Sequence, residues 1–339
     1  MSLPDVWFVL VAVFWVGFFV LEGFDFGVGM LHRVVGRSEQ EQRLAINSIG
    51  PFWDGNEVWL IVAGAATFAA FPSWYATWFS AGYLALVLVL AALIIRGVSF
   101  EFRGKGRSGA WRATWSWTMT IGSVLVPLLL GVALGDLLAG LPIDSSEEFT
   151  GTFWDLLTPF GLSTGVALLL LSAVHGATFL GLRTSGTVHT RARRAARLLS
   201  WPCVVVVAVF GGWGQGLSSG GVWRMVLPVL ATLATICAAL LIRRGSEGAA
   251  FTATAIAIGS AAGSLFAFIY PAVMVSSTTA SNTLTVAGTA SGDYALRVMT
   301  VVAVLTFPLV LLYQGWTYYV FRRRLVSPPE PMEPSTVAD

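Results

Sequence analysis

The sequence predicts an all-α membrane protein that crosses the bilayer several times. Charged residues make up only 11% of its 339 residues and hydrophobic residues 56%, whereas a soluble domain carries about 25% charged residues. The apolar residues gather in runs long enough to span a membrane. The basic residues fall on alternate connections between these runs. These three observations place the whole chain in a bilayer.

Nine apolar runs have the roughly 17 to 25 residues that a transmembrane helix needs. Gly50-Pro51 interrupts the start of the second run, and we expect a helix break there. Together the nine runs form one transmembrane domain over residues 1–326, and the Pro-rich tail 327–339 is expected to be disordered and cytoplasmic. The predicted spans are 6–31, 50–71, 77–96, 114–138, 156–182, 198–214, 224–243, 250–275 and 294–321.

The basic residues predict the orientation of the spans. Eighteen of the twenty lie on one set of alternate connections, and only Arg224 and Arg297 lie on the other set. By the positive-inside rule the N-terminus is outside and the C-terminus cytoplasmic, which requires an odd number of spans. The eighteen are Arg33, Arg37, Arg43, Arg96, Arg103, Lys105, Arg107, Arg112, Arg183, Arg191, Arg193, Arg194, Arg197, Arg243, Arg244 and Arg322 to Arg324.

Two sequence features bear on cofactors. Cys203 and Cys237 both lie in apolar runs, which favours buried small side chains over a metal site. His32 and His189 are expected in cytoplasmic connections, so His175 is the one histidine predicted within a span. Buried haems need axial ligands, so this chain alone is not expected to hold several haems. No metal site, no nucleophilic triad and no nucleic-acid partner is predicted.

The sequence shows a weak internal similarity. Glu22-Gly23 aligns with His175-Gly176, and Ile121-Gly122-Ser123 aligns with Ile258-Gly259-Ser260. This similarity is either a chance match or the remainder of a repeat that gives two parallel four-helix halves and one extra helix. A proton-coupled secondary transporter, the alternative function, would instead show inverted repeats and discontinuous helices in both halves.

Acidic residues inside the spans are the main candidates for function. Glu22 and Asp25 lie three residues apart, on one face of a helix. A charged group costs at least about 2.5 kcal/mol at the centre of a membrane helix, and two neighbouring carboxylates in a low dielectric cannot both stay ionised cheaply. The pair therefore forms either a protonatable stripe or part of a buried polar network.

A second group combines helix breakers, acids and indoles in the run from Gly50 to Trp59. Irregular backbone at membrane depth is tolerated where it is buried in protein or lines a cavity, so Asp54 is a candidate buried proton site. The alternative is that Trp53 and Trp59 anchor the interface while the acids cap a helix. Glu101, at the inner end of the third span, either takes up protons from the cytoplasm or pairs locally with arginine.

These segments resemble a known family. Five runs are similar to those of cytochrome bd oxidase subunit II. They are Gly23-Phe24-Asp25-Phe26-Gly27-Val28-Gly29, Ile46 to Asn56 with Trp53-Asp54-Gly55-Asn56, Arg96-Gly97-Val98-Ser99-Phe100-Glu101-Phe102-Arg103, Asn282-Thr283-Leu284-Thr285 and Val298-Met299-Thr300. The likeness covers almost the whole chain. Phe52, where some relatives have His, and Glu101, where Asp is frequent, depart from the pattern.

The resemblance implies a haem-free subunit of two four-helix bundles and a peripheral helix, in the bacterial cytoplasmic membrane. Its partner would be subunit I, which carries haem b and haem d; the complex would oxidise quinol and reduce O₂ to water, electrogenically but without pumping. The implied proton path runs through Asp54, Asp25, Glu101 and Glu22. Trp53 and Trp59 are implied to mark O₂ entry or the interface. A quinone or lipid in this chain, a small accessory subunit, and the choice between menaquinol and ubiquinol stay open.

Overall fold

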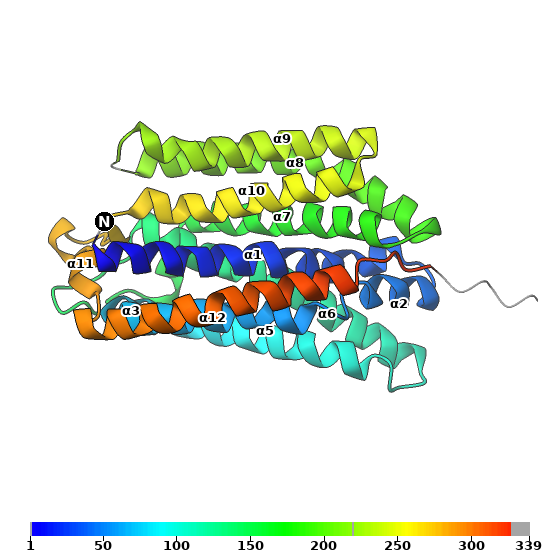
Figure 1. Cartoon of the computed structure of the whole chain (residues 1–339), viewed down its shortest axis with the longest axis horizontal. Coiled ribbons are helices and arrows are strands. Elements are labelled where there is room, and N and C mark those ends of the chain that lie inside the picture. The colour runs from blue at the N-terminus through cyan, green and yellow to red at the C-terminus, as the bar shows by residue number, and fades with distance from the viewer. Residues whose placement is uncertain (1, 219, 327–339) are drawn as a thin grey trace, which may run out of the picture.

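The computed structural model describes residues 2–218 and 220–326, and the tail predicted at 327–339 lies outside them. Within the described part, eight helices are long and apolar enough to cross a membrane. They run side by side along the long axis of the molecule (Figure 1). The prediction of an all-helical multi-pass membrane protein is confirmed. The eight are α1 (Leu3–Val35), α5 (Tyr83–Phe102), α6 (Gly109–Ala139), α7 (Pro159–Arg183), α8 (Gly186–Leu217), α9 (Val226–Arg244), α10 (Glu247–Ile269) and α12 (Asp293–Val320).

A further helix, α3 (Trp53–Ala70), occupies the second predicted span. It carries Asp54, Asn56 and Glu57 near its start, which makes it less apolar than the eight. The chain turns at Gly50-Pro51 just before this helix, as the sequence predicts. Three shorter helices complete the set, namely α2 (Glu39–Asn47), α4 (Pro72–Ala81) and α11 (Val286–Thr289).

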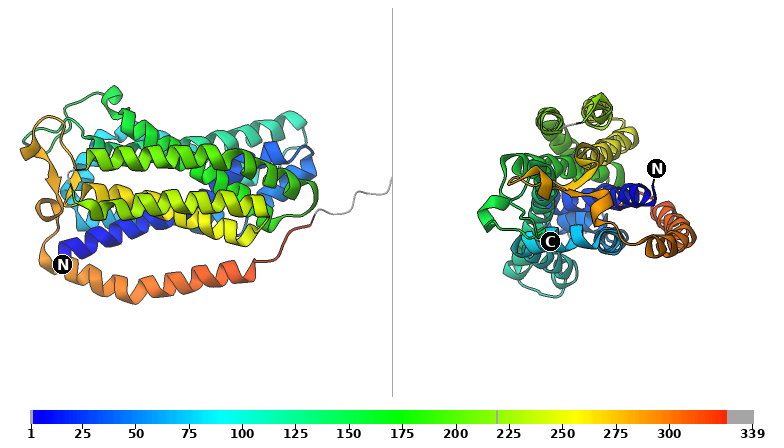
Figure 2. Two further views of the ribbon diagram at one scale, coloured as in Figure 1. Left: turned by 90° about the horizontal axis from the view of Figure 1, so that it is seen from above. Right: turned by 90° about the vertical axis from the view of Figure 1, so that its left-hand side faces the viewer.

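Helix α1 lies at the centre and packs against α3, α6, α7 and α10. On one side of it α5 packs on α6, and on the other α7, α8, α9 and α10 pack on one another. Among the long helices, α12 packs mainly on α1 and α3, and Figure 2 shows it along the outer edge. The two groups of helices therefore meet at α1 and along the contact between α6 and α7, with α12 at the periphery.

Several helix ends differ from the predicted span boundaries, most of all at α8, which begins at Gly186 where the span was predicted from 198. The span predicted at 250–275 ends at Ile269, because Pro271 lacks a backbone donor and the chain continues into strand β1 (Ala272–Met274). Strand β1 pairs antiparallel with β2 (Leu284–Thr285). The span predicted from 156 begins at Pro159, after the 3₁₀ turn Phe153–Leu156. The span predicted to end at 96 continues to Phe102.

The two ends of the bundle differ in composition. The N-terminus and α11 lie at one end, and α2 lies at the other, where the traced part of the chain also finishes (Figure 1). The end with α2 carries the clustered arginines of the connections, for example Arg37 and Arg43. The opposite end is closed by β1, β2 and the segment 140–158.

Candidate functional site

Helix α1 presents two acids to the interior of the bundle. Glu22 and Asp25 are both completely buried. Glycines on the same stretch let other helices approach: a Cβ at Gly27 would collide with the backbone of α7 at Ser172 and Gly176. Close backbone contact excludes lipid and water, so the acids face protein rather than the membrane.

Arg96 of α5 neutralises Glu22. Its Nη1 lies 2.6 Å from Glu22 Oε1, and neither side chain is exposed. The Nε donates to Ser123 Oγ at 3.3 Å, and the guanidinium lies 4.8 Å from the centre of the Phe26 ring. A buried ion pair is tolerated only when the remaining donors and acceptors also find partners, and these contacts supply part of that compensation.

Glu57 of α3 extends the cluster toward the surface. Its Oε2 lies 3.4 Å from Arg96 Nη1, and its side chain keeps 26% of its area exposed. Arg96 therefore sits between a completely buried acid and one that is partly accessible. We call Glu22, Asp25, Asn56, Glu57 and Arg96 the buried charged cluster.

Asp25 is held through an amide. Asn56 Nδ2 donates to Asp25 Oδ2 at 2.6 Å and to the backbone oxygen of Leu21 at 3.0 Å. Asn56 Oδ1 accepts from Gln314 Nε2 at 2.7 Å and from the Tyr318 hydroxyl at 3.1 Å. Asp25 Oδ1 has no hydrogen-bond partner among the described residues. The peripheral helix α12 is thus linked to the buried acid by a chain of hydrogen bonds.

The structure places the four acids that the sequence predicted for the proton path in two different environments. Glu22 and Asp25 lie together in the buried charged cluster, whereas Asp54 and Glu101 are exposed on the surface of this chain. The expectation that Asp54 is buried is therefore wrong for the isolated chain. Trp53 stacks on Phe100 with ring centres 4.6 Å apart, which joins the start of α3 to the inner end of α5.

Sequence reasoning missed several members of the site. Arg96 was assigned to a connection, although it lies inside α5 and is completely buried. Asn56 and Glu57 stand in the motif with Asp54 but were not singled out. Gln314 is a lone amide in the last apolar run, and such an isolated polar residue in a span could have flagged it.

Two histidines are buried rather than one. His32 was predicted in a connection, but it lies in α1, is completely buried, and its Nδ1 is 2.8 Å from the backbone oxygen of Gly29. His175 Nδ1 lies 2.6 Å from Thr254 Oγ1, and its ring stacks on Phe251 at 4.4 Å. No group of three or more His, Cys, Asp or Glu residues in the described chain is arranged to bind a metal.

The cysteines differ from the sequence expectation in one respect. Cys203 is buried, but Cys237 is exposed on α9.

An apolar groove of about 680 Å³ opens between α1, α3 and α12. Trp59 and Phe307 both line it, and their rings pack edge to face with centres 6.0 Å apart. Gln314 also lines the groove, so it borders the buried charged cluster. Trp59, which the sequence singled out, belongs to this groove, whereas Trp53 does not line it.

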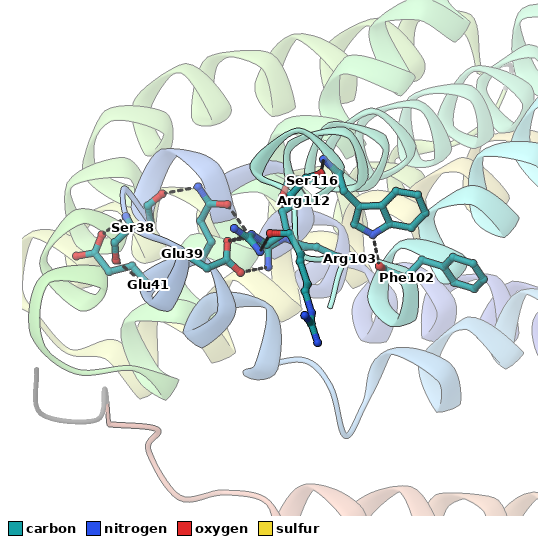
Figure 3. A network of polar contacts seen from close by, with 12 residues as sticks. Ser38, Glu39, Glu41, Phe102, Arg103, Arg112 and Ser116 are labelled. Atoms are coloured by element: carbon teal, nitrogen blue, oxygen red, sulfur yellow. Dashed lines mark hydrogen bonds and ion pairs between the residues drawn. The ribbon is translucent and has the colours of Figure 1, made fainter. Parts of the chain in front are cut away.

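At the α2 end, a second polar network joins α2 to α5 and α6 (Figure 3). Arg103 forms two hydrogen bonds of 2.8 Å to the Glu39 carboxylate and one of 2.7 Å to Ser116 Oγ. Arg112 Nε lies 3.7 Å from Glu39. The indole of Trp111 donates to the Phe102 oxygen at 2.7 Å. These contacts fix the C-terminal end of α5 and the N-terminal end of α6 beside α2.

Glu41 of α2 binds the start of α8. Burial alone would raise its pKa, but hydrogen bonds from four neighbours outweigh burial and lower the pKa of Glu41 to about 2. The donors are Thr187 Oγ1 at 2.5 Å, the Arg37 N–H at 2.7 Å, Arg191 Nη1 at 2.7 Å and the Ser38 N–H at 3.2 Å.

The fold and the cluster define a multi-pass membrane protein with ionisable groups buried at membrane depth. Residues 3–321 match the model of the cytochrome bd terminal oxidase subunit II family. Cytochrome bd ubiquinol oxidase subunit 2 of Bacillus subtilis is 44% identical over 335 residues, which cover 98% of this chain and 99% of the relative. Cytochrome bd-I ubiquinol oxidase subunit 2 of Escherichia coli K12 is 36% identical, over 95% of each chain.

A solved structure shares the fold. A chain of the bd oxidase from Geobacillus thermodenitrificans superposes with a TM-score of 0.74 at 16% identity, over 95% of this chain and 99% of that one. The chain belongs to the cytochrome bd terminal oxidase subunit II family. It is therefore part of an oxidoreductase complex and a multi-pass protein of the bacterial cytoplasmic membrane. These matches give no support to the alternative of a secondary transporter.

Proposed function

We propose that this chain is the haem-free subunit of a quinol oxidase and that it conducts protons toward O₂ reduction in a haem-bearing subunit I. The observation that carries the proposal is the buried charged cluster. It contains three carboxylates, on Glu22, Asp25 and Glu57, but one guanidinium, on Arg96. Buried ionisable groups are costly and mark proton relays in membrane proteins. Three acids around one cation can exchange protons without placing a new charge in lipid.

Exposed acids connect the cluster to the surface of the chain. Glu57 is partly exposed, and Asp54 lies one helical turn before it on α3. The stacking of Trp53 on Phe100 holds Asp54 and Glu101 on adjoining parts of α3 and α5. We propose that protons reach Glu57 and Glu22 past these two exposed acids, and that subunit I covers this surface in the complex.

The surroundings of the buried histidines support a haem-free role. A Cβ at Gly23 would lie 3.8 Å from His175 Cδ2, so the α1 backbone stands beside the Nε2 side of that ring. A haem at Nε2 would displace α1. His32 is likewise enclosed completely. We therefore place haem b and haem d in subunit I, and we propose quinol and O₂ as the substrates of the complex.

We also propose that α3 is a ninth span. At about 1.5 Å per residue, its 18 residues reach roughly 27 Å, close to the thickness of the hydrocarbon core. With nine spans, the arginine-rich end of the bundle faces the cytoplasm and the N-terminus lies outside. The nine helices then form two bundles of four, α1, α3, α5 and α6 with α7 to α10, and α12 is the peripheral helix. Residues 1–326 form a single transmembrane domain.

The groove lined by Trp59 suits an apolar ligand. Its lining is almost entirely hydrophobic, and it opens between α3 and α12. We propose that it admits O₂, a quinone tail or a lipid chain from the bilayer. Apolar clefts with few polar groups are the usual form of such sites.

The test is to purify the complex through a tag on this chain and to record its reduced-minus-oxidised spectrum and its quinol-dependent oxygen uptake. We expect haem b and haem d bands. We expect Asp25→Asn to slow uptake at least about tenfold at unchanged haem content, because loss of a proton-transfer group typically costs about 10²- to 10⁴-fold. Glu148→Gln, at an exposed acid far from the cluster, is the matched control.

Two results would contradict parts of the proposal. A pure preparation without a haem-bearing partner would remove the assignment as an oxidase subunit. Normal uptake in Asp25→Asn and Glu22→Gln would leave the subunit assignment and remove the proton path. Asp54→Asn tests the surface route separately, and slower uptake is the expected result.

A further inference from the structure

Helix α12 packs lightly on the bundle, and polar contacts hold both of its halves. Of its described side chains, only Leu296 is buried. At its outer end, the indole of Trp7 donates to the Leu296 oxygen at 3.2 Å and to Thr300 Oγ1 at 3.0 Å. In its inner half, Gln314 and Tyr318 donate to Asn56. A helix that packs so lightly nevertheless places two donors on the residue that holds Asp25.

Gln314, Tyr318 and the Leu21 oxygen together favour one orientation of the Asn56 amide, with its nitrogen toward Asp25. A carboxamide offers two acceptor sites on oxygen and two donors on nitrogen. Gln314 and Tyr318 donate to Oδ1, while Nδ2 donates to Asp25 and to the Leu21 oxygen. A flipped amide would place its oxygen against the Leu21 oxygen, which can only accept, and would require Gln314 to flip and the Tyr318 hydroxyl to turn so that both accept.

We propose that Gln314 and Tyr318 are positioning residues for Asp25, and that they act through Asn56. They hold the amide so that it donates to the Asp25 carboxylate and fixes its direction within the proton path. This inference rests on the proposed function. It adds α12, which carries no acid facing the cluster, to the elements that set the rate of proton transfer.

Packing around the pair makes substitution feasible. The Tyr318 ring stacks on Phe52 with centres 4.7 Å apart and lies edge-on to Phe24 at 6.2 Å. Tyr318→Phe keeps both contacts and removes only the hydroxyl. Gln314→Met keeps the length of the side chain and removes its donor. The matched control is Tyr319→Phe, at an exposed tyrosine one position further on that has no contact with Asn56.

The experiment compares the two single variants, the double variant and the control in the purified holo-complex. Each single variant leaves one donor on Asn56, and we expect oxygen uptake within about twofold of the wild type. The double variant should fall about tenfold, because hydrogen bonds around a charged group are strong and residues of one network do not act additively. Haem content should stay unchanged in all four.

A spectroscopic signature separates positioning from packing. The carboxyl C=O band that disappears from infrared difference spectra in Asp25→Asn belongs to Asp25. We expect this band to shift in the double variant and to stay in place in Tyr319→Phe, because a changed hydrogen-bond donor alters the carboxyl vibration.

The outcomes distinguish this inference from the proposed function. If Asp25→Asn slows uptake while the double variant neither slows it nor shifts the band, α12 plays no positioning role and the proton path stands. If Asp25→Asn itself has wild-type uptake, the proton path fails. Should the double variant fail to assemble, the band is compared in the single variants, where the loss of one donor to Asn56 should shift it by a smaller amount. An unmoved band in both overturns the inference.

Discussion

The carboxylate of Glu22 and the guanidinium of Arg96 form an ion pair across α1 and α5, with 2.6 Å between Oε1 and Nη1 and no exposed area on either side chain. Transfer of each charge out of water costs several kcal/mol, which mutual attraction repays only with good geometry and further hydrogen bonds. Glu57 and Ser123 provide such contacts on the arginine side. The pair therefore fastens two helices and keeps a charged group next to Asp25.

Removal of one partner should be far more harmful than removal of both. We expect Arg96→Met to lower the free energy of unfolding by about 3 to 5 kcal/mol, because Glu22 would be left buried without its cation. The double variant Glu22→Gln with Arg96→Met should recover a good part of that loss. Thermal denaturation of the purified complex measures both. Equal stability of Arg96→Met and the wild type would show that the pair contributes no net stability.

Hydropathy predicted the eight long apolar helices because run length and composition are local properties. The same pattern placed the end of a span at Arg96, on the assumption that a charge marks the interface. That boundary was wrong because Arg96 finds its counter-ion on α1, some 70 residues away in sequence. A pairing of this kind depends on which helices meet, and one sequence does not reveal it.

The candidate site was predicted in part for a similar reason. The spacing of Glu22 and Asp25 places both on one helix face, and the structure confirms that the face is buried. For Asp54, the motif alone could not fix the rotation of α3, which turns Asn56 inward and Asp54 outward. Whether α3 crosses the membrane stays a prediction, because its first turn is polar.

Gly27 should tolerate no side chain. A Cβ there would meet the backbone of Ser172 and Gly176, and backbone cannot move aside as a flexible side chain can. We expect Gly27→Ala to destabilise the chain by about 1 to 3 kcal/mol or more through overpacking of α1 on α7. The yield and denaturation temperature of the complex measure the effect. Gly212→Ala is the control, since a Cβ there meets nothing within 4 Å, and an equal loss in both variants would refute the argument.

Glu41 should make stability depend on pH in the acid range. Its pKa in the folded chain is lowered to about 2 from an ordinary value of 4.5. Its stabilisation is therefore fully present above about pH 4.5 and is lost as the pH falls from 4.5 toward 2. Denaturation temperatures between pH 6 and pH 3 should fall less steeply in Glu41→Gln, which starts on the order of 1 kcal/mol less stable at neutral pH.

The control for Glu41 is Glu148→Gln, since the Glu148 side chain is exposed at the opposite end of the bundle. We expect the pH dependence of this variant to match that of the wild type. Identical acid profiles in Glu41→Gln and the wild type would mean that the bonds between α2 and α8 contribute nothing to stability.

The segment 321–326 after α12 holds the C-terminal end of that helix on the bundle. The Leu325 N–H donates to the Arg183 oxygen at 2.8 Å, and Ser185 Oγ donates to the Leu325 oxygen at 3.3 Å. Arg324 pairs with Glu247, whose other oxygen lies 3.1 Å from His189 Nε2. Because α12 is otherwise lightly packed, these contacts should determine how firmly its last turns are held.

Leu325→Pro should loosen the inner turns of α12, because proline has no N–H to donate to Arg183. We expect hydrogen exchange of the backbone amides in 312–320 to accelerate about tenfold, as local opening becomes easier when a fastening hydrogen bond is lost. Val326→Pro is the matched control, because among the described residues the bridge between Thr184 and Leu325 uses the N–H of Leu325 and not that of Val326. Unchanged exchange in Leu325→Pro would mean that Gln314 and Tyr318, through Asn56, suffice to hold the inner half of α12.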